Sequence, residues 1–247
     1  MDRVPERRRT GFTLIELLVV MAVIAVFLGV IGLAVSSSGG AMGTQAAQRT
    51  VTTMISAARS QAISSQSKVR LIIHADPPAA GDMADPRREK FLRFMAILVD
   101  GPNGWEELND GTYLPKGTYV VPPWTLDAPA PTIGGNIISV SSSDWEHERR
   151  SIVEPQTMQY AYGDPTGAAP TNHYIFIEFD PRGTTEPTTE IGGRDYERRI
   201  VLAPAKTTGS IPHFANNEDL NVLGGVIRRN GSFTLINDPE GFPEPLP

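Results

Sequence analysis

The clearest pattern along the chain is an unbroken apolar run near its N-terminus. Residues 12–35 contain a single ionisable side chain, Glu16, close to the start of the run. As a helix, these 24 residues would measure about 36 Å, and the hydrocarbon core of a bilayer is about 30 Å thick. The run therefore predicts a transmembrane helix over residues 12–35. A carboxylate inside such a helix costs about 2.5–3.5 kcal/mol on insertion scales and usually marks a function.

A second, amphipathic pattern follows in residues 36–66. Serines and glycines fill residues 36–43, and each Gly costs about 1 kcal/mol relative to Ala inside a helix. We therefore expect a kink or a short interruption there. Beyond it, apolar residues recur with the spacing of one helical stripe, at Ala47, Val51, Met54, Ile55, Ala58 and Ala62. This spacing predicts a helix that continues to about Ser65 and packs the stripe on a sheet.

The rest of the chain, residues 67–237, shows strand patterns separated by turn signals. We expect strands at residues 69–75, 91–100, 174–180, 197–203, 226–229 and 232–236. The pair Asn230-Gly231 favours a two-residue type I′ hairpin. Residues 122–171 show no clear periodicity and predict a loop-rich middle, and the four prolines of residues 238–247 predict an extended tail. The expected fold class is α+β, with a long N-terminal helix packed on an antiparallel β-sheet head.

The residues before the apolar run carry a distinctive signal. Four arginines precede Gly11, and Gly11 lies before the apolar run, where a secretory signal would have its small cleavage residues after it. This arrangement resembles the N-terminus of type IV prepilins and type II secretion pseudopilins. The resemblance implies a pilin-like fold, and it implies that a prepilin peptidase cuts after Gly11 and methylates Phe12. Residues 1–11 would then be a cleaved basic leader, and Glu16 would occupy the fifth mature position, where the family has a glutamate.

The proposed cut also gives a physical reason for Glu16. A carboxylate in an apolar medium is tolerated when it is paired, and cleavage creates an amine on Phe12 about one helical turn away. The resemblance implies that Glu16 of one subunit pairs with the N-terminus of its neighbour in a fibre. The alternative is an uncleaved anchor in which Glu16 reaches the lipid headgroups. In both cases the arginines hold the leader in the cytoplasm, so the head faces the periplasm or the outside.

A second, shorter resemblance concerns the head. The order of elements, the residues Arg59-Ser60-Gln61-Ala62 before the first strand, and the segment Phe179-Asp180-Pro181-Arg182-Gly183 are similar to minor pseudopilins of the general secretion pathway protein H type. The resemblance implies that the chain is a minor subunit of its filament. The large head also favours a minor over a major subunit.

Composition narrows the functional classes. The net charge is −6, and the residues after the basic leader carry −8, so we expect no nucleic-acid partner. Cysteine is absent, which excludes disulfides and thiolate metal sites. Many pilins close a C-terminal loop with a disulfide, and this chain departs from that pattern.

Candidate chemistry in the head is sparse. The four histidines belong to no H-E-x-x-H motif, and no G-x-S-x-G motif occurs, so we expect no enzymatic activity, no catalytic residues and no cofactor. Asp100, Asn103 and Asp110 cluster around a turn signal, and their oxygens could hold Ca²⁺, which some pseudopilins use in place of a disulfide. The spacing does not follow an EF-hand loop, and a plain hydrophilic hairpin explains the same residues.

The sequence thus predicts a structural subunit that is processed in the cytoplasmic membrane and then assembled into a filament. The expected partners are the prepilin peptidase and methyltransferase, other pilin or pseudopilin subunits, an inner-membrane assembly platform and membrane lipid. A type IV pilus, a secretion pseudopilus and a DNA-uptake filament share this N-terminal pattern. The alternative hypothesis is a membrane-tethered periplasmic binding module with no filament role, for which Glu16 would be dispensable.

Overall fold

The computed structural model describes most of the head and the helix that precedes it. The described residues are 14–79, 82, 84–121, 132–133, 136–137, 157–163, 171–186, 188–191, 194–196, 198–208, 211–214 and 222–237. The chain divides into two compact units, Met1–Gly39 and Gly40–Pro247, which are considered separately below.

The long helix α1 spans Leu14–Ser65 and contributes residues to both units. Residues 36–43 belong to this helix, so the interruption expected at the serines and glycines is not observed. Helix propagation is cooperative, and apolar helical segments on both sides offset the local cost of glycine. In the first unit, the apolar side chains that are described are exposed; Leu14 is 84% and Ile15 70% accessible. Within the described residues, we find no helix with the length and apolar character of a membrane span.

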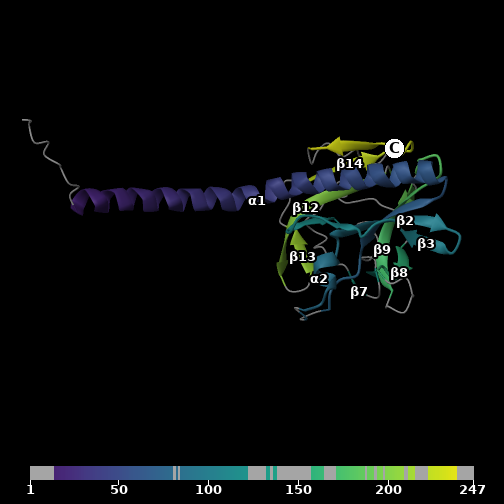
Figure 1. The fold of residues 1–247 in the computed structure, drawn as a ribbon, viewed down its shortest axis with the longest axis horizontal. Coiled ribbons are helices and arrows are strands. Elements are labelled where there is room, and N and C mark those ends of the chain that lie inside the picture. The colour runs from purple at the N-terminus through teal and green to yellow at the C-terminus, as the bar shows by residue number, and fades with distance from the viewer. Residues whose placement is uncertain are drawn as a thin grey trace, which may run out of the picture. The chain divides into compact units, whose positions relative to one another are not determined.

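In the second unit, α1 packs the predicted stripe into the main core of the head. All six stripe residues belong to this core, so the predicted packing face is confirmed. Several of the six are alanines, and their small side chains let the helix backbone approach the sheet closely. The helix ends at Ser65, as expected, because Gln66 takes a positive φ of 53° and breaks the helical geometry. Figure 1 shows this part of α1 running along the β-rich head.

A six-stranded antiparallel sheet carries the centre of the head. Its strand order is β3-β2-β1-β9-β8, and β4 also pairs with β2. The bounds are β1 Val69–His74, β2 Phe94–Gly101, β3 Gly104–Glu107, β4 Thr112–Tyr113, β8 Thr157–Tyr160 and β9 Asn172–Phe179. One face packs on α1 through Leu71 and Ile73, and the other carries a smaller core around Ile72 and Phe176. Burial on both faces explains why the central strands are so apolar.

A five-stranded antiparallel sheet completes the main core. Its order is β13-β12-β14-β15, and β5 also pairs with β12. The bounds are β5 Thr118–Val120, β12 Arg198–Thr208, β13 Ile211–Phe214, β14 Leu223–Ile227 and β15 Phe233–Ile236. The short helix α2 spans Arg87–Lys90, and two small hairpins pair β6 (Thr132–Ile133) with β7 (Asn136–Ile137) and β10 (Thr188–Ile191) with β11 (Arg194–Tyr196).

Two local expectations were wrong. The strand expected from residue 91 begins at Phe94, because residues 91–93 form a turn in which Leu92 has a φ of 53°. Five residues, 228–232, connect β14 to β15, and a hydrogen bond between Arg228 and Ser232 leaves a three-residue loop in place of a type I′ pair. There Gly231 donates to the Arg228 carbonyl over 2.7 Å and has a φ of 73°, while Arg228 donates to the Ser232 carbonyl over 2.8 Å. This is a type I turn closed by a left-handed glycine, which requires only one positive φ.

The remaining regional expectations lie largely outside the described residues. In the middle region 122–171, the structure describes β6, β7, β8 and a few neighbouring residues. The tail at residues 238–247 is outside the described part altogether. The loop-rich middle and the extended tail therefore stay predictions, and the same holds for the leader at residues 1–11.

Candidate functional site

The processing residues predicted from the sequence lie at the edge of the described structure. Gly11 and Phe12 fall outside it, and Glu16 lies in α1 with its side chain outside the described part. Their roles as cleavage site, methylated N-terminus and assembly residue therefore stay predictions. What the structure adds is a polar cavity in the head.

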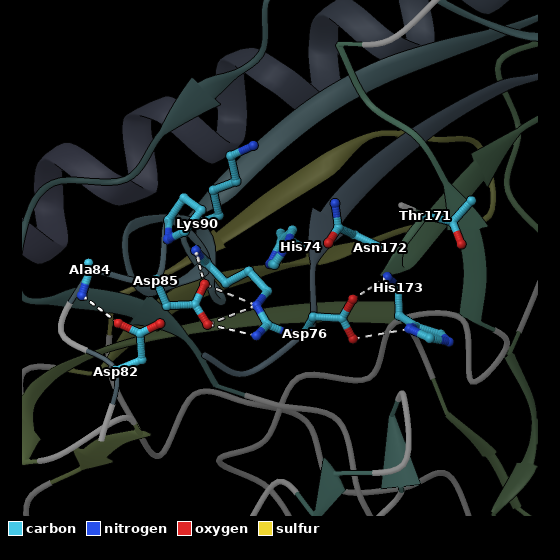
Figure 2. A pocket seen from close by; sticks show the side chains of 11 residues that line it. His74, Asp76, Asp82, Ala84, Asp85, Lys90, Thr171, Asn172 and His173 are labelled. Carbon is cyan, nitrogen blue, oxygen red and sulfur yellow. Dashed lines mark hydrogen bonds and ion pairs between the residues drawn. The ribbon is translucent and has the colours of Figure 1, made fainter. Parts of the chain in front are cut away.

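This cavity has a volume of about 620 Å³ and lies where three segments meet. The end of β1 provides His74 and Asp76, the segment that contains α2 provides Asp85 and Lys90, and the start of β9 provides its remaining wall. The positions follow from the sheet register, since His74 of β1 pairs with Tyr174 of β9. In the view of Figure 2, His74 lies between Asp85 and Lys90 on one side and Asn172 and His173 on the other.

An ion pair shapes the wall that contains α2. Asp85 is buried, and Arg87 donates to its carboxylate from Nη2 over 2.7 Å and from Nε over 3.0 Å. The backbone N–H groups of Ala79 and Arg87 donate to the same carboxylate over 2.7 and 2.9 Å. The hydrogen bond from the Arg87 side chain is the main cause that holds the pKa of Asp85 well below its usual range. Asp85 therefore stays ionised and holds the loop between β1 and α2.

A second acid–base pair closes the opposite wall. The backbone N–H of His173 donates to Asp76 Oδ2 over 2.7 Å, and His173 Nδ1 lies 3.0 Å from Asp76 Oδ1. The other ring nitrogen of His173 lies 2.8 Å from Gln159 Nε2 on β8. Both nitrogens of this ring therefore have partners. The carboxylate of Asp76 is satisfied in the same way as that of Asp85, by a neighbour in the cavity wall.

His74 differs from these pairs because it is buried without partners. Its side chain is fully buried, and no donor or acceptor in the described residues meets hydrogen-bonding geometry at either ring nitrogen, although the Asn172 side chain is close enough to raise the pKa of His74 slightly. Burial lowers the pKa of His74 to about 4, against the attraction of the nearby Asp76 carboxylate, so the ring is neutral at pH 7. An unsatisfied buried polar group costs about 1–3 kcal/mol, so an unpartnered imidazole on a cavity wall requires an explanation.

The backbone beside His74 is strained. The N–H of Leu92 donates to the His74 carbonyl over 2.9 Å, and Val120 donates to the Leu92 carbonyl over 2.9 Å. Leu92 is fully buried and has a φ of 53°, a left-handed conformation that is uncommon for a bulky residue. Strain of this kind costs about 1–3 kcal/mol and clusters at functional sites. The turn that carries Leu92 connects α2 to β2 and contacts the backbone of His74 on the cavity wall.

Lys90 supplies an uncompensated positive charge to this cavity. Its ammonium lies 5.7 Å from the centre of the Phe94 ring, and it forms no ion pair within the described part of the chain. Asp82, on the same side of His74 as Asp85 in Figure 2, is exposed and accepts a hydrogen bond from the Ala84 N–H over 2.9 Å. The two other acids of the wall are already paired with Arg87 and His173.

The acidic turn proposed for Ca²⁺ is a plain hairpin in the described structure. Asp100 lies in β2 opposite Trp105 of β3, Asn103 lies in the turn, and Asp110 is exposed beyond β3. Across the described residues, no group of three or more His, Asp or Glu side chains lies close enough to hold a metal ion. Asn103 is none of these residue types, so the Ca²⁺ site stays a prediction.

Residues Phe179–Gly183, noted for their resemblance to minor pseudopilins, form a structural turn. Asp180 Oδ1 accepts hydrogen bonds from the backbone N–H groups of Arg182 and Thr184 over 2.9 and 2.8 Å. Arg59 of α1 donates from Nε to the Gly183 carbonyl over 3.2 Å. Burial alone would raise the pKa of Asp180, but the hydrogen bonds from Thr184 and Arg182 lower it. This turn fastens the end of α1 to the sheets.

Sequence reasoning found the histidines but not the cavity. Of the four, His74 and His173 line the cavity, His213 lies in β13, and His147 is outside the described residues. The signal that could have found the cavity is His74 itself, a buried titratable residue at the end of a strand that is apolar apart from Arg70. Its significance depends on Asn172 and His173, about 100 positions later, and only strand pairing brings these residues together.

Comparison with known families identifies the N-terminal segment. A model of the prokaryotic N-terminal methylation motif matches residues 7–32, which include Gly11, Phe12 and Glu16. The N-terminal segment therefore carries the methylation motif of pilin-like proteins. Comparisons with curated proteins and with solved structures give no match. The motif covers only the pilin-like N-terminus, so the resemblance of the head to general secretion pathway protein H stays a prediction.

Proposed function

We propose that this chain is a structural subunit of a type IV pilus or a type II secretion pseudopilus, and that it is a minor subunit of that filament. The single observation that carries the proposal is the methylation motif at residues 7–32. The motif makes the chain a pilin-like substrate of a prepilin peptidase. The subunit is inserted in the cytoplasmic membrane by its apolar segment and is then transferred to the filament by an assembly platform.

The exposed apolar residues of the first unit support this role. Leu14, Ile15, Leu17 and Leu18 are each more than half exposed in the isolated chain. Exposed apolar surface of this extent marks contact with lipid or with other proteins. In a filament, the same residues pack against neighbouring subunits, and Glu16 pairs with the methylated amine of Phe12 on the next subunit. An unpaired carboxylate in that environment would penalise a slip in register.

The first test is the chemical nature of the mature N-terminus. Mass spectrometry of the protein purified from cells with an active prepilin peptidase should find N-methylated Phe12. Gly11→Val should leave the leader attached, because a branched side chain occupies the cut site. Gly29→Val, which changes a glycine beyond the cut, is the matched control and should be processed normally. An intact leader on the unaltered protein would contradict the proposal.

The second test separates insertion from assembly. Glu16→Ala should leave the protein processed and in the membrane but should prevent its co-purification with filaments. The carboxamide variant Glu16→Gln keeps the shape of the side chain without its charge and should fail in the same way. Normal incorporation of both variants would remove the proposed role of Glu16 in register.

The membrane-tethered binding module is favoured by one observation, the polar cavity with its unpartnered His74. In that case the protein would stay in the membrane and would be missing from purified filaments. Neither role requires catalysis: Asp76 and Asp85 are both satisfied by neighbours in the cavity wall, and the motif is that of a structural subunit.

A further inference from the structure

We propose that the cavity beside β1 and α2 binds a small organic acid that carries one carboxylate and at least one hydroxyl group. Nothing in the N-terminal motif requires such a site, so this inference goes beyond the filament role. It depends on three features that occur together in the head: a cavity of about 620 Å³, a fully buried imidazole on its wall, and a lysine, the last two without a hydrogen-bond or ion-pair partner among the described residues.

The hydroxyl group is assigned from the protonation state of His74. A neutral imidazole offers one N–H donor and one nitrogen acceptor, and a hydroxyl group can both donate and accept. Burial keeps the pKa of His74 at about 4, so the ring presents this donor–acceptor pair throughout the neutral range. Asn172 lies beside His74 in Figure 2, and its amide provides a second donor and acceptor for a polyhydroxylated ligand.

The single carboxylate is assigned from the charges on the wall. Asp85 is neutralised by Arg87 over 2.7 Å, and Asp76 lies 3.0 Å from the imidazole of His173. Lys90 is left as the cation that can meet an anionic group. Asp82, which is exposed and lies in the same segment as Asp85, carries a negative charge that would repel a second carboxylate of the ligand. The wall therefore favours a monoanion over a tricarboxylate such as citrate.

The strained turn at Leu92 fixes these groups in advance. Leu92 holds the His74 carbonyl through its N–H, and two residues earlier Lys90 ends α2. One short segment, from Arg87 to Leu92, thus positions the cation and contacts the strand that carries the imidazole. A site whose groups are held before the ligand arrives loses less entropy on binding.

Binding to the full chain in detergent can be measured by titration calorimetry with three matched probes. Glucuronate carries hydroxyls and one carboxylate, glucose carries only the hydroxyls, and acetate carries only the carboxylate. We expect glucuronate to bind at least tenfold more tightly than either of the others. We also expect it to shift the ¹⁵N signals of the His74 ring, assigned with the variant His74→Gln.

Lysine variants test the assignment of the charge. Lys90→Met keeps the length of the side chain and should weaken glucuronate binding at least tenfold while leaving glucose binding unchanged. The matched control is Lys116→Met, since Lys116 is an exposed lysine that does not line the cavity. Equal losses in the two variants would reduce the effect to general surface charge and would overturn the proposal. Equal binding of all three probes, no binding of any probe, or binding that leaves the His74 signals unchanged would also overturn it.

Discussion

The two parts of α1 use apolar side chains in opposite ways. Between Leu14 and Ile24, the large apolar residues that are described are exposed, whereas Val51 and Ile55 in the second part are buried in the core of the head. Both segments are helical and both are rich in apolar residues. The second part has its partner within the chain, whereas the described apolar side chains of the first part are exposed in the isolated chain. Under the proposed function, lipid or neighbouring subunits supply that partner.

The amino acids in the two parts reflect this difference. The packed part places small residues at its contact face, with Ala47, Ala58 and Ala62 all fully buried, which permits close approach to a sheet. The first part has a nearly continuous series of Leu, Ile and Val around Glu16. A helix that is apolar all round suits an apolar environment, and a helix with one apolar stripe suits one sheet. The amino acids of the two parts therefore match the exposure of the first and the burial of the second.

The largest effect that tests this comparison is expected from a matched pair of isoleucines on α1. Ile55→Ala should lower the free energy of unfolding of the head by about 2–5 kcal/mol, because it creates a cavity in the core. Ile15→Ala removes the same atoms from an exposed position and should change the free energy of unfolding by less than about 0.5 kcal/mol. Urea titration of the full chain in detergent, followed by tryptophan fluorescence, measures both. Equal losses would show that the two parts of the helix do not differ in this way.

A pH titration should give the next largest effect, confined to the head. The pKa of His74 is about 4 in the folded state and 6.5 in the unfolded state. Between these values the unfolded chain binds more protons, so stability falls as the pH falls from about 6.5 to about 4 and then levels off for this group. The total loss in the free energy of unfolding is about 3 kcal/mol, since each pKa unit between the two states is worth about 1.4 kcal/mol. Urea titrations at several pH values measure the loss.

The variant His74→Leu identifies the source of this pH dependence. It removes the titrating ring from the cavity wall, so the slope between pH 4 and 6.5 should largely disappear. Two carboxylates with lowered pKa values act mainly below this window. Glu178 and Asp180 have folded pKa values below their usual values of 4.5 and 3.8, so their contributions are present above those values and are lost only at lower pH. A persistent slope in the variant would mean that another group titrates.

A smaller effect is expected where the head fastens the end of α1. Gly231 has a φ of 73°, and a Cβ at this position would collide with the carbonyl oxygen of Gly183, which itself accepts a hydrogen bond from Arg59. Gly231→Ala should therefore lower the free energy of unfolding by about 2 kcal/mol or more. The control is Gly117→Ala, with a φ of 81° and no heavy atom within 4 Å of the added Cβ. Gly117→Ala should lower the free energy of unfolding by only about 1 kcal/mol, because alanine is strained in the left-handed backbone conformation. Similar losses would show that Gly231 is constrained by its backbone alone.

How much the sequence could predict depended on whether the signal was local. The helical stripe from Ala47 to Ala62 and the central strands β1 and β9 follow from periodicity, and the structure confirms them. The motif around Gly11 is equally local, since its elements are consecutive. The cavity could not be predicted, because it depends on pairing His74 with Tyr174, a hundred residues away. The error at Asn230-Gly231 has a related cause: the pair fits two turn types, and the pairing of Ile227 with Phe233 selects between them.

The smallest effect is expected from a substitution at the beginning of the packed part of α1. Gln48 is buried, and its Nε2 donates to the carbonyls of Gly224 and Ile236, over 2.8 and 3.2 Å, at the edge formed by β14 and β15. Gln48→Leu should cost about 1–2 kcal/mol, because it leaves these acceptors without their donor. Gln45→Leu changes an exposed glutamine one turn earlier and should be nearly neutral in the same urea titration. Equal effects would mean that α1 is fastened to the sheet by its apolar stripe alone. A loss at position 48 only would show that polar contacts fix its position along the sheet.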